Sequence, residues 1–141
     1  MSETVDTSPR KARREFKNIG FGQILTSYKL PWSGKVSILH RVSGAALFLA
    51  LPFLLYLFDK SLTSELSFFT FAEVVGNPLI KLILLGLIWA FLHHFCAGIR
   101  FLALDLHKGV EKHQIQKSAV SVLVVSLSLT VVLGAKLFNL F

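Results

Sequence analysis

The run from Leu82 to Ile99 limits the possible folds more than any other feature of this chain. It holds 18 residues without a formal charge and is bounded by Lys81 and Arg100. A helix of this length is long enough to cross most of a bilayer, and two adjacent histidines, His93 and His94, lie within it. His94 would lie about 9 Å inside the Arg100 end. An imidazole at that depth is energetically costly, so it marks a candidate functional site.

Two further apolar runs accompany the first. Val42 to Phe58 has 17 residues and Ser118 to Ala135 has 18, in a chain of 141 residues that is 53% hydrophobic. We therefore predict an all-α integral membrane protein with three transmembrane helices, spanning about residues 36–58, 79–104 and 115–138. Together these spans form one transmembrane domain, 36–141. An N-terminal segment, 1–35, precedes it at the cytoplasmic interface.

Local signals mark where these helices begin and how they connect. Pro31 and Gly34 are expected to break any helix before the first span, and Pro78 suits the first turn of the second. The connection from Glu65 to Asn77 is rich in phenylalanine, so we expect it to lie on the outer membrane interface.

The distribution of lysine and arginine predicts the orientation. Of the 15 such residues, eight lie up to Arg41 and four between positions 100 and 117, which gives twelve on one side. Only Lys60, Lys81 and Lys136 fall on the other. The positive-inside rule then predicts a cytoplasmic N-terminus and a periplasmic C-terminus. The formal charge of +7 therefore reflects topology, and we do not expect nucleic-acid binding or a cleaved signal peptide.

Polar chemistry gathers at the cytoplasmic mouth of the first span, in the string SILHRVSG from Ser37 to Gly44. On a helix, Ser37, His40 and Arg41 share one face. A hydroxyl, an imidazole and a guanidinium at the boundary of water and lipid can bond a quinone carbonyl or pair with a haem propionate. The alternative is that Arg41 is only a positively charged anchor and His40 an interfacial residue.

His94 is a better candidate haem ligand than His93. Adjacent helical residues point about 100° apart, so the two cannot bind one metal. The helix stripe that contains His94 has only small neighbours: Gly86, Ala90 and Gly98. Such a stripe leaves room for a flat porphyrin, although it also simply allows helices to pack closely. We expect His40 to lie too near the membrane mouth to bind the same iron, so a second axial ligand would come from another polypeptide.

Three motifs together resemble a known family. SILHRVSG, the pattern HxxxGIR ending at Arg100, and Asp105 five residues later are similar to the cytochrome b membrane-anchor subunit of succinate dehydrogenase, especially the proteobacterial type. The resemblance implies a respiratory complex of four subunits in the bacterial inner membrane. In it a flavoprotein oxidises succinate, an iron–sulfur protein relays electrons, and two small membrane subunits share one haem b and help to form a ubiquinone site. The three predicted spans would then form half of a haem-bridged helical bundle.

The resemblance also implies roles for individual residues. His94 matches the axial ligand of the haem iron, Ser37 and Arg41 match quinone-site residues, and Asp105 matches an acidic residue close to that site. His40 and Arg41 would lie near a haem propionate. The family commonly has a histidine directly after the arginine of GIR, whereas this chain has Phe101. This departure removes a competing ligand.

These patterns predict an enzyme subunit that carries no part of the succinate chemistry itself. Its expected function is to bind haem and orient quinone while electrons pass from succinate to ubiquinone. One alternative is a fumarate reductase anchor that uses menaquinone. Others are a small transporter subunit with a proton path lined by histidine, or an anchor without a cofactor. Haem absorbance would separate the two haem-binding hypotheses from the last two.

Overall fold

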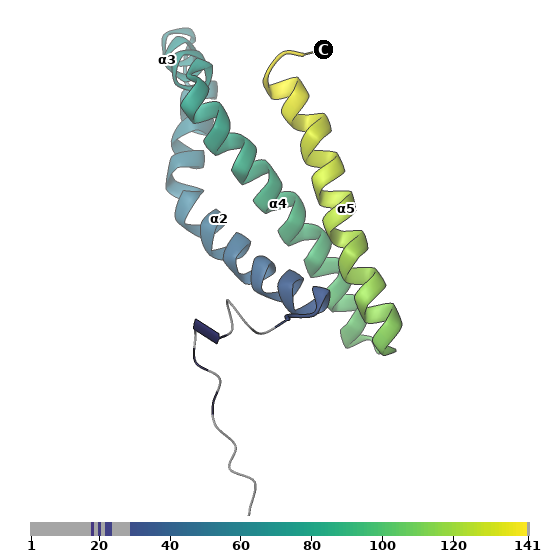
Figure 1. The fold of residues 1–141 in the computed structure, drawn as a ribbon. Helices are drawn as coiled ribbons and strands as arrows, with labels where there is room; N and C mark the ends of the chain where they lie inside the picture. The colour runs from purple at the N-terminus through teal and green to yellow at the C-terminus, as the bar shows by residue number, and fades with distance from the viewer. Residues whose placement is uncertain (1–17, 19, 21, 24–28, 141) are drawn as a thin grey trace, which may run out of the picture.

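A computed structural model describes residues 18, 20, 22–23 and 29–140. From residue 29 onwards the described chain forms four helices and no strand: α2 (Trp32–Leu62), α3 (Glu65–Gly76), α4 (Pro78–Asp105) and α5 (Lys112–Leu137) (Figure 1). The predicted all-α fold is therefore confirmed. Most of the N-terminal segment 1–35, including its basic stretch, lies outside the described residues.

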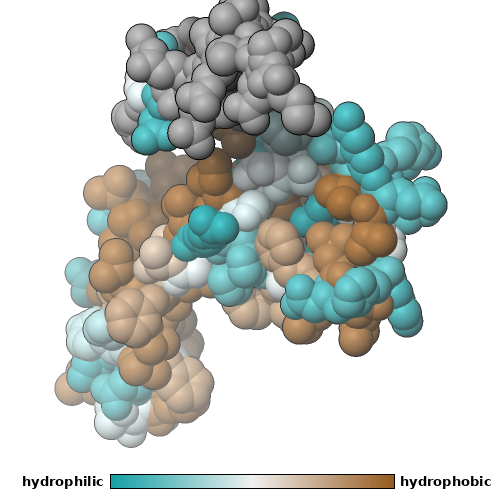
Figure 2. All heavy atoms as spheres, turned by 90° about the horizontal axis from the view of Figure 1, so that it is seen from below, coloured by the Kyte–Doolittle hydropathy of each residue, from teal (hydrophilic) through white to brown (hydrophobic). Residues whose placement is uncertain are grey.

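The three long helices have the length and composition of membrane spans. α2 has 31 residues, α4 has 28 and α5 has 26, and each contains a strongly apolar stretch. Their outward faces are apolar as well, since Phe48 is 75% exposed, Leu49 77% and Val131 71%. Brown hydrophobic side chains accordingly cover much of the surface in Figure 2. Because lipid hydrocarbon removes the cost of exposing such side chains, these faces suit a bilayer.

The helix starts follow from local hydrogen bonds. α2 begins at Trp32, directly after Pro31, and the backbone N–H of Lys35 closes its first turn on the Pro31 carbonyl at 3.1 Å. The prediction that Gly34 helps to end the preceding structure was therefore wrong, because Gly34 lies inside α2. α4 begins at Pro78 as predicted, and the Asn77 side chain caps it by accepting from the backbone N–H of Leu79 at 2.9 Å.

The sequence did not reveal that the Glu65–Asn77 connection is mostly helical. Ser64 and Ser67 form a reciprocal cap on α3, in which the N–H of each residue donates to the hydroxyl of the other at 2.9 and 3.1 Å. Such a capping box satisfies backbone groups that a short helix would otherwise leave unpaired. Phe68 and Phe69 on α3 remain exposed.

α4 is the central helix, since it packs against α2, α3 and α5. The start of α2 and the α4–α5 connection lie at one end of the bundle, whereas α3 and the C-terminal end of α5 lie at the other (Figure 1). At the first end, Gln116 on α5 bonds Ser33 on α2 twice, at 3.2 and 3.3 Å. The three spans are thus joined near the mouth of the predicted site.

Candidate functional site

The N-terminal half of α2 meets the C-terminal half of α4 at two histidines. The imidazole rings of His40 and His94 stack with their centroids 4.2 Å apart and their planes only 6° from parallel. His40 lies on α2 and His94 on α4, so residues 54 positions apart in the chain form one contact. The sequence did not predict this contact; it predicted only that His40 lies too near the membrane mouth to bind the same iron as His94, and that stays a prediction.

A hydrogen bond fixes the orientation of His94. Its Nδ1 lies 2.9 Å from the carbonyl oxygen of His40, which also accepts from the Ser43 hydroxyl at 2.9 Å. The Ser43 hydroxyl is itself 3.4 Å from the same Nδ1. Since a carbonyl oxygen can only accept, the His94 Nδ1 carries the proton and donates. In the neutral ring the lone pair then resides on Nε2, which is the arrangement that a metal-binding histidine has when a backbone carbonyl holds its other nitrogen.

The contact between His94 and α2 depends on a glycine. A Cβ atom at Gly44 would lie 2.8 Å from Cε1 and 3.2 Å from Nδ1 of His94. The first distance is shorter than real Cβ contacts allow. By contrast, a Cβ atom at Gly98 would lie 3.8 Å from the Nε2 of His40, an ordinary van der Waals distance. Gly44 is therefore the glycine that lets the His94 ring approach the backbone of α2.

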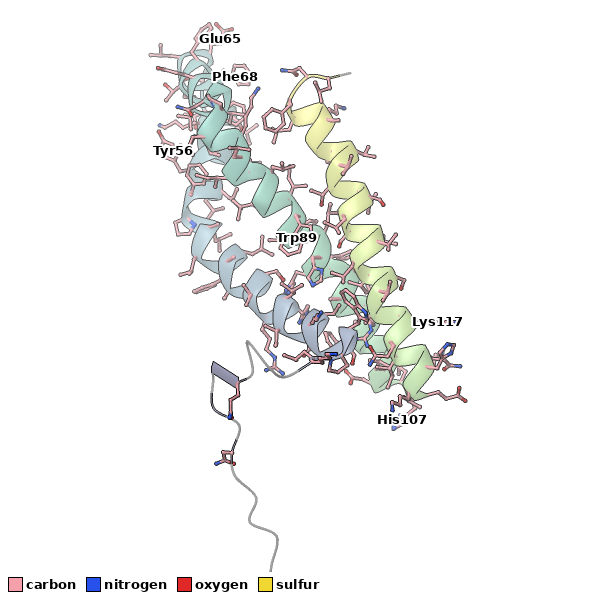
Figure 3. All side chains as sticks on the ribbon, in the orientation of Figure 1. Tyr56, Glu65, Phe68, Trp89, His107 and Lys117 are labelled. Atoms are coloured by element: carbon pink, nitrogen blue, oxygen red, sulfur yellow. The ribbon has the colours of Figure 1, made fainter. Side chains whose placement is uncertain are left out.

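His93 has a different environment. Its side chain has no exposed surface, and neither ring nitrogen has a hydrogen-bond partner among the described residues. Its ring lies 5.3 Å from that of Trp89, which Figure 3 shows in the middle of the bundle. Ala97 and Arg100, which share its helix stripe, are buried too. A residue enclosed in this way has no surface against which a macrocycle could lie.

The stacked geometry bears on how many ligands this chain can offer. The lone pair of an imidazole nitrogen lies in the plane of its ring, so two imidazoles hold one metal ion only where the edges of both rings converge on it. The rings of His40 and His94 stack face to face and do not point their nitrogens at one another. Within the described residues this pair therefore does not converge on a single point where one metal ion could be clamped between them.

The residues predicted to bind quinone lie at the same end of the bundle as this pair. Ser37 is half-buried and Arg41 exposed on α2, while Asp105 is the last residue of α4 and is exposed. The structure gives none of the three a hydrogen bond or ion pair to another described residue. They are thus accessible, although the fold brings no direct contact between Asp105 and the two residues of α2.

Sequence reasoning missed Ser43 and the structural importance of Arg100. Arg100 is only 7% exposed, and it donates through Nε to the Ser118 hydroxyl at 3.0 Å and through Nη2 to the Ile115 carbonyl at 3.1 Å. Its guanidinium also lies 5.2 Å from the ring of Phe101, which in turn lies 5.1 Å from that of His40. Ser43 lies in the string SILHRVSG and Arg100 ends the pattern HxxxGIR, so these motifs could have indicated both residues.

Comparison with known proteins places this geometry in a family. Residues 15–133 match the family model of the succinate dehydrogenase/fumarate reductase transmembrane subunit. The chain belongs to this family.

Individual relatives match this chain over most of their length. The chain is 37% identical over 111 residues to the succinate dehydrogenase cytochrome b556 subunit of Coxiella burnetii, which covers 78% of this chain and 89% of the relative. It is 34% identical over 109 residues to the subunit of Rickettsia felis, covering 77% and 85%. For the Paracoccus denitrificans subunit the identity is 33% over 107 residues, covering 76% and 82%.

Family membership and the three apolar helices make the chain a multi-pass membrane protein, and a bacterial inner membrane fits its relatives. Those relatives are subunits of an oxidoreductase complex, so a subunit of this kind works beside other subunits. The predicted family and location are thus confirmed.

Proposed function

We propose that this chain is a cytochrome b membrane anchor of succinate dehydrogenase, which binds one haem b together with a second anchor subunit and contributes to a ubiquinone-reduction site. The observation that carries the proposal is the hydrogen bond from His94 Nδ1 to the His40 carbonyl. It holds Nδ1 on a carbonyl of α2 and, in the neutral ring, leaves the lone pair on Nε2, as an axial ligand requires. The names of the relatives, which are b556 cytochromes, support a haem of the b type.

The described residues fit a haem at His94 better than at His93. His94 is half-buried with one nitrogen oriented by a carbonyl, whereas His93 is fully buried between helices and has no well-formed hydrogen bond. When bound, the haem iron would accept and release one electron at a time. His40 and Arg41, on the face of α2 beside His94, would pair with a propionate, and the second axial ligand would come from the partner anchor.

Ser37, Arg41 and Asp105 would form this chain's part of the quinone site. Arg41 offers a charged donor and Ser37 a hydroxyl, one turn apart in the N-terminal half of α2. Such donors hold a carbonyl oxygen and stabilise negative charge that develops on it. Asp105 lies at the same end of the bundle and would tune the local charge.

The remaining steps belong to other subunits. A flavoprotein would oxidise succinate, and an iron–sulfur subunit would pass the electrons to the membrane. This chain would then anchor the assembly without contributing a residue to succinate oxidation.

A second candidate is a fumarate reductase anchor that uses menaquinone, because the matching family includes both enzymes. Purified complex should reduce a ubiquinone analogue with succinate faster than it oxidises a menaquinol analogue with fumarate. The opposite ratio would favour the reductase.

The distribution of charge predicts the topology of the three spans. With twelve lysine and arginine residues at one end and three at the other, the N-terminus should be cytoplasmic and the C-terminus periplasmic. Alkaline phosphatase fused after Phe141 should be active, since it folds only in the periplasm, and β-galactosidase at the same position should be inactive. Active β-galactosidase there would contradict the orientation.

The glycine contact predicts a matched pair of variants. Gly44→Ala places a methyl group against the His94 ring and should displace it. Overpacking of this kind costs about 1–3 kcal/mol, so haem occupancy should fall about fivefold or more. Gly98→Ala, whose methyl group has room, should keep normal haem content. Pyridine haemochrome absorbance per complex measures both, and equal haem in the two variants would mean that Gly44 does not position the ligand.

A further inference from the structure

The groove between α4 and α5 holds a cavity that the haem and quinone proposals do not use. Its volume is about 380 Å³, and it opens near the α4–α5 connection. Polar and basic side chains line one part of it: Arg100, Lys108, Gln114 and Ser118. No aspartate or glutamate lines it within the described chain. In Figure 2 hydrophilic atoms gather at the right, the side on which this connection lies.

Arg100 lines this cavity and carries a charge that no described acidic side chain pairs. The residue is only 7% exposed, Nε and Nη2 are bonded to α5, and Nη1 is buried without a partner among the described residues. A buried guanidinium without a countercharge is costly, and an anion in the cavity beside it would lower that cost. Lys108 provides a second positive charge on the same cavity wall.

The cavity continues as an apolar groove. A neighbouring cavity of about 180 Å³ shares four lining residues with the first, including Cys96 and Val122, and extends along α5 to Val125. Arg100 is the first charged residue after the apolar run that ends at Ile99. It therefore lies at the boundary between hydrocarbon and headgroups, with cations on the headgroup side and apolar walls on the other.

We propose that this groove binds an anionic phospholipid, with its phosphate on Arg100 and Lys108 and one acyl chain along α4 and α5. An arginine and a lysine are common phosphate donors, and basic pockets between membrane helices bind lipid headgroups. A zwitterionic lipid would bring an ammonium group into a cavity without an acidic side chain. A free phosphate would leave the apolar groove unfilled.

Alkylation of Cys96 reports whether the groove is occupied, because Cys96 lines both cavities and is the only cysteine of the chain. The full-length chain is purified in detergent with its accompanying subunits, stripped of lipid, and titrated with phosphatidylglycerol, phosphatidylcholine or inorganic phosphate. Native mass spectrometry counts the bound lipid, and peptide mass spectrometry gives the alkylation rate of Cys96. Phosphatidylglycerol should slow alkylation several-fold at concentrations where the other two have no effect.

Variants separate the charge from general packing. Lys108→Gln should raise the phosphatidylglycerol concentration for half-protection about fivefold, and Arg100→Gln about tenfold or more. Lys117→Gln removes an exposed charge at the same end without lining the cavity, and should change nothing (Figure 3). If Arg100→Gln does not assemble, Lys108→Gln decides the question. Normal haem absorbance in Lys108→Gln would show that the lipid site is separate from the haem proposal.

Four results would overturn the proposal. Equal protection by phosphatidylcholine would mean that the charge of the lipid is not recognised. Protection by inorganic phosphate alone would make this a site for free anion. An unchanged response in Lys108→Gln would remove the basic cavity wall from the binding site. Slow alkylation in the stripped complex, with no response to any lipid, would mean that a side chain of a neighbouring subunit fills the groove.

Discussion

Replacing His94 by leucine should remove most of the b-type haem absorbance of the purified complex. Of the adjacent histidine pair, only His94 is less than fully buried and has its ring oriented by a well-formed hydrogen bond, from Nδ1 to the His40 carbonyl. Removing a residue that only hydrogen-bonds to a metal ligand lowers metal affinity about 10- to 100-fold. Removing the ligand itself should therefore reduce haem content by about tenfold or more. The Soret band relative to bound flavin measures this content.

His93→Leu is the matched control, since it changes the next residue on the same helix in the same way. The His93 ring has no hydrogen-bond partner among the described residues and no exposed surface. An apolar side chain of similar size therefore replaces buried nitrogens that make no well-formed hydrogen bond, and the helix packing should survive. Normal low-spin spectra in both variants, or loss of haem in His93→Leu alone, would make the assignment of His94 wrong.

Most of the fold could be predicted from hydropathy and charge. Three runs without formal charges, each long enough to cross a bilayer as a helix, predict three spans because a helix pairs its own backbone groups in lipid. The short helix α3 escaped prediction because its reciprocal Ser64–Ser67 cap involves two serines rather than the usual serine and glutamate, and its phenylalanines carry no clear helical period. The start of α2 was misplaced because Gly34 was taken as a helix breaker, although it fits within the first turn.

The candidate site was predictable in composition but not in geometry. Small neighbours on one helix stripe favoured His94, and the structure adds an independent reason in the hydrogen bond of its Nδ1. The stacking of His40 on His94 could not be predicted from the depth of each residue along its own helix, because it depends on how α2 and α4 cross. Arg100 marked only the end of an apolar run in the sequence, whereas its bonds to Ile115 and Ser118 require α5 to lie alongside.

Replacing Arg41 by leucine should reduce the efficiency of quinone reduction by about ten- to a hundredfold. Arg41 is exposed on α2, so a lipid-soluble ring can reach its guanidinium without that charge entering the bilayer centre. A hydrogen bond to a charged group contributes about 1.5–3 kcal/mol, and about 1.4 kcal/mol corresponds to a factor of ten in kcat/KM. Ser37→Ala should lower the same rate by a smaller factor, because it removes only a neutral donor.

A matched control separates quinone binding from membrane topology. Lys35→Leu removes another exposed positive charge from the start of α2, and Lys35 contacts the ring of Trp32 at 4.3 Å. If Arg41 were only a positively charged anchor, both leucine variants would affect quinone reduction equally.

The assay must also separate quinone reduction from the earlier electron-transfer steps. Electron transfer from succinate to a soluble artificial acceptor does not require the membrane site, so it should survive in the Arg41→Leu and Ser37→Ala complexes. Flavin content shows whether each complex has remained assembled. A wild-type rate of quinone reduction in an intact Arg41→Leu complex would place the quinone elsewhere, since no other described cation shares the α2 face of Ser37 and His40.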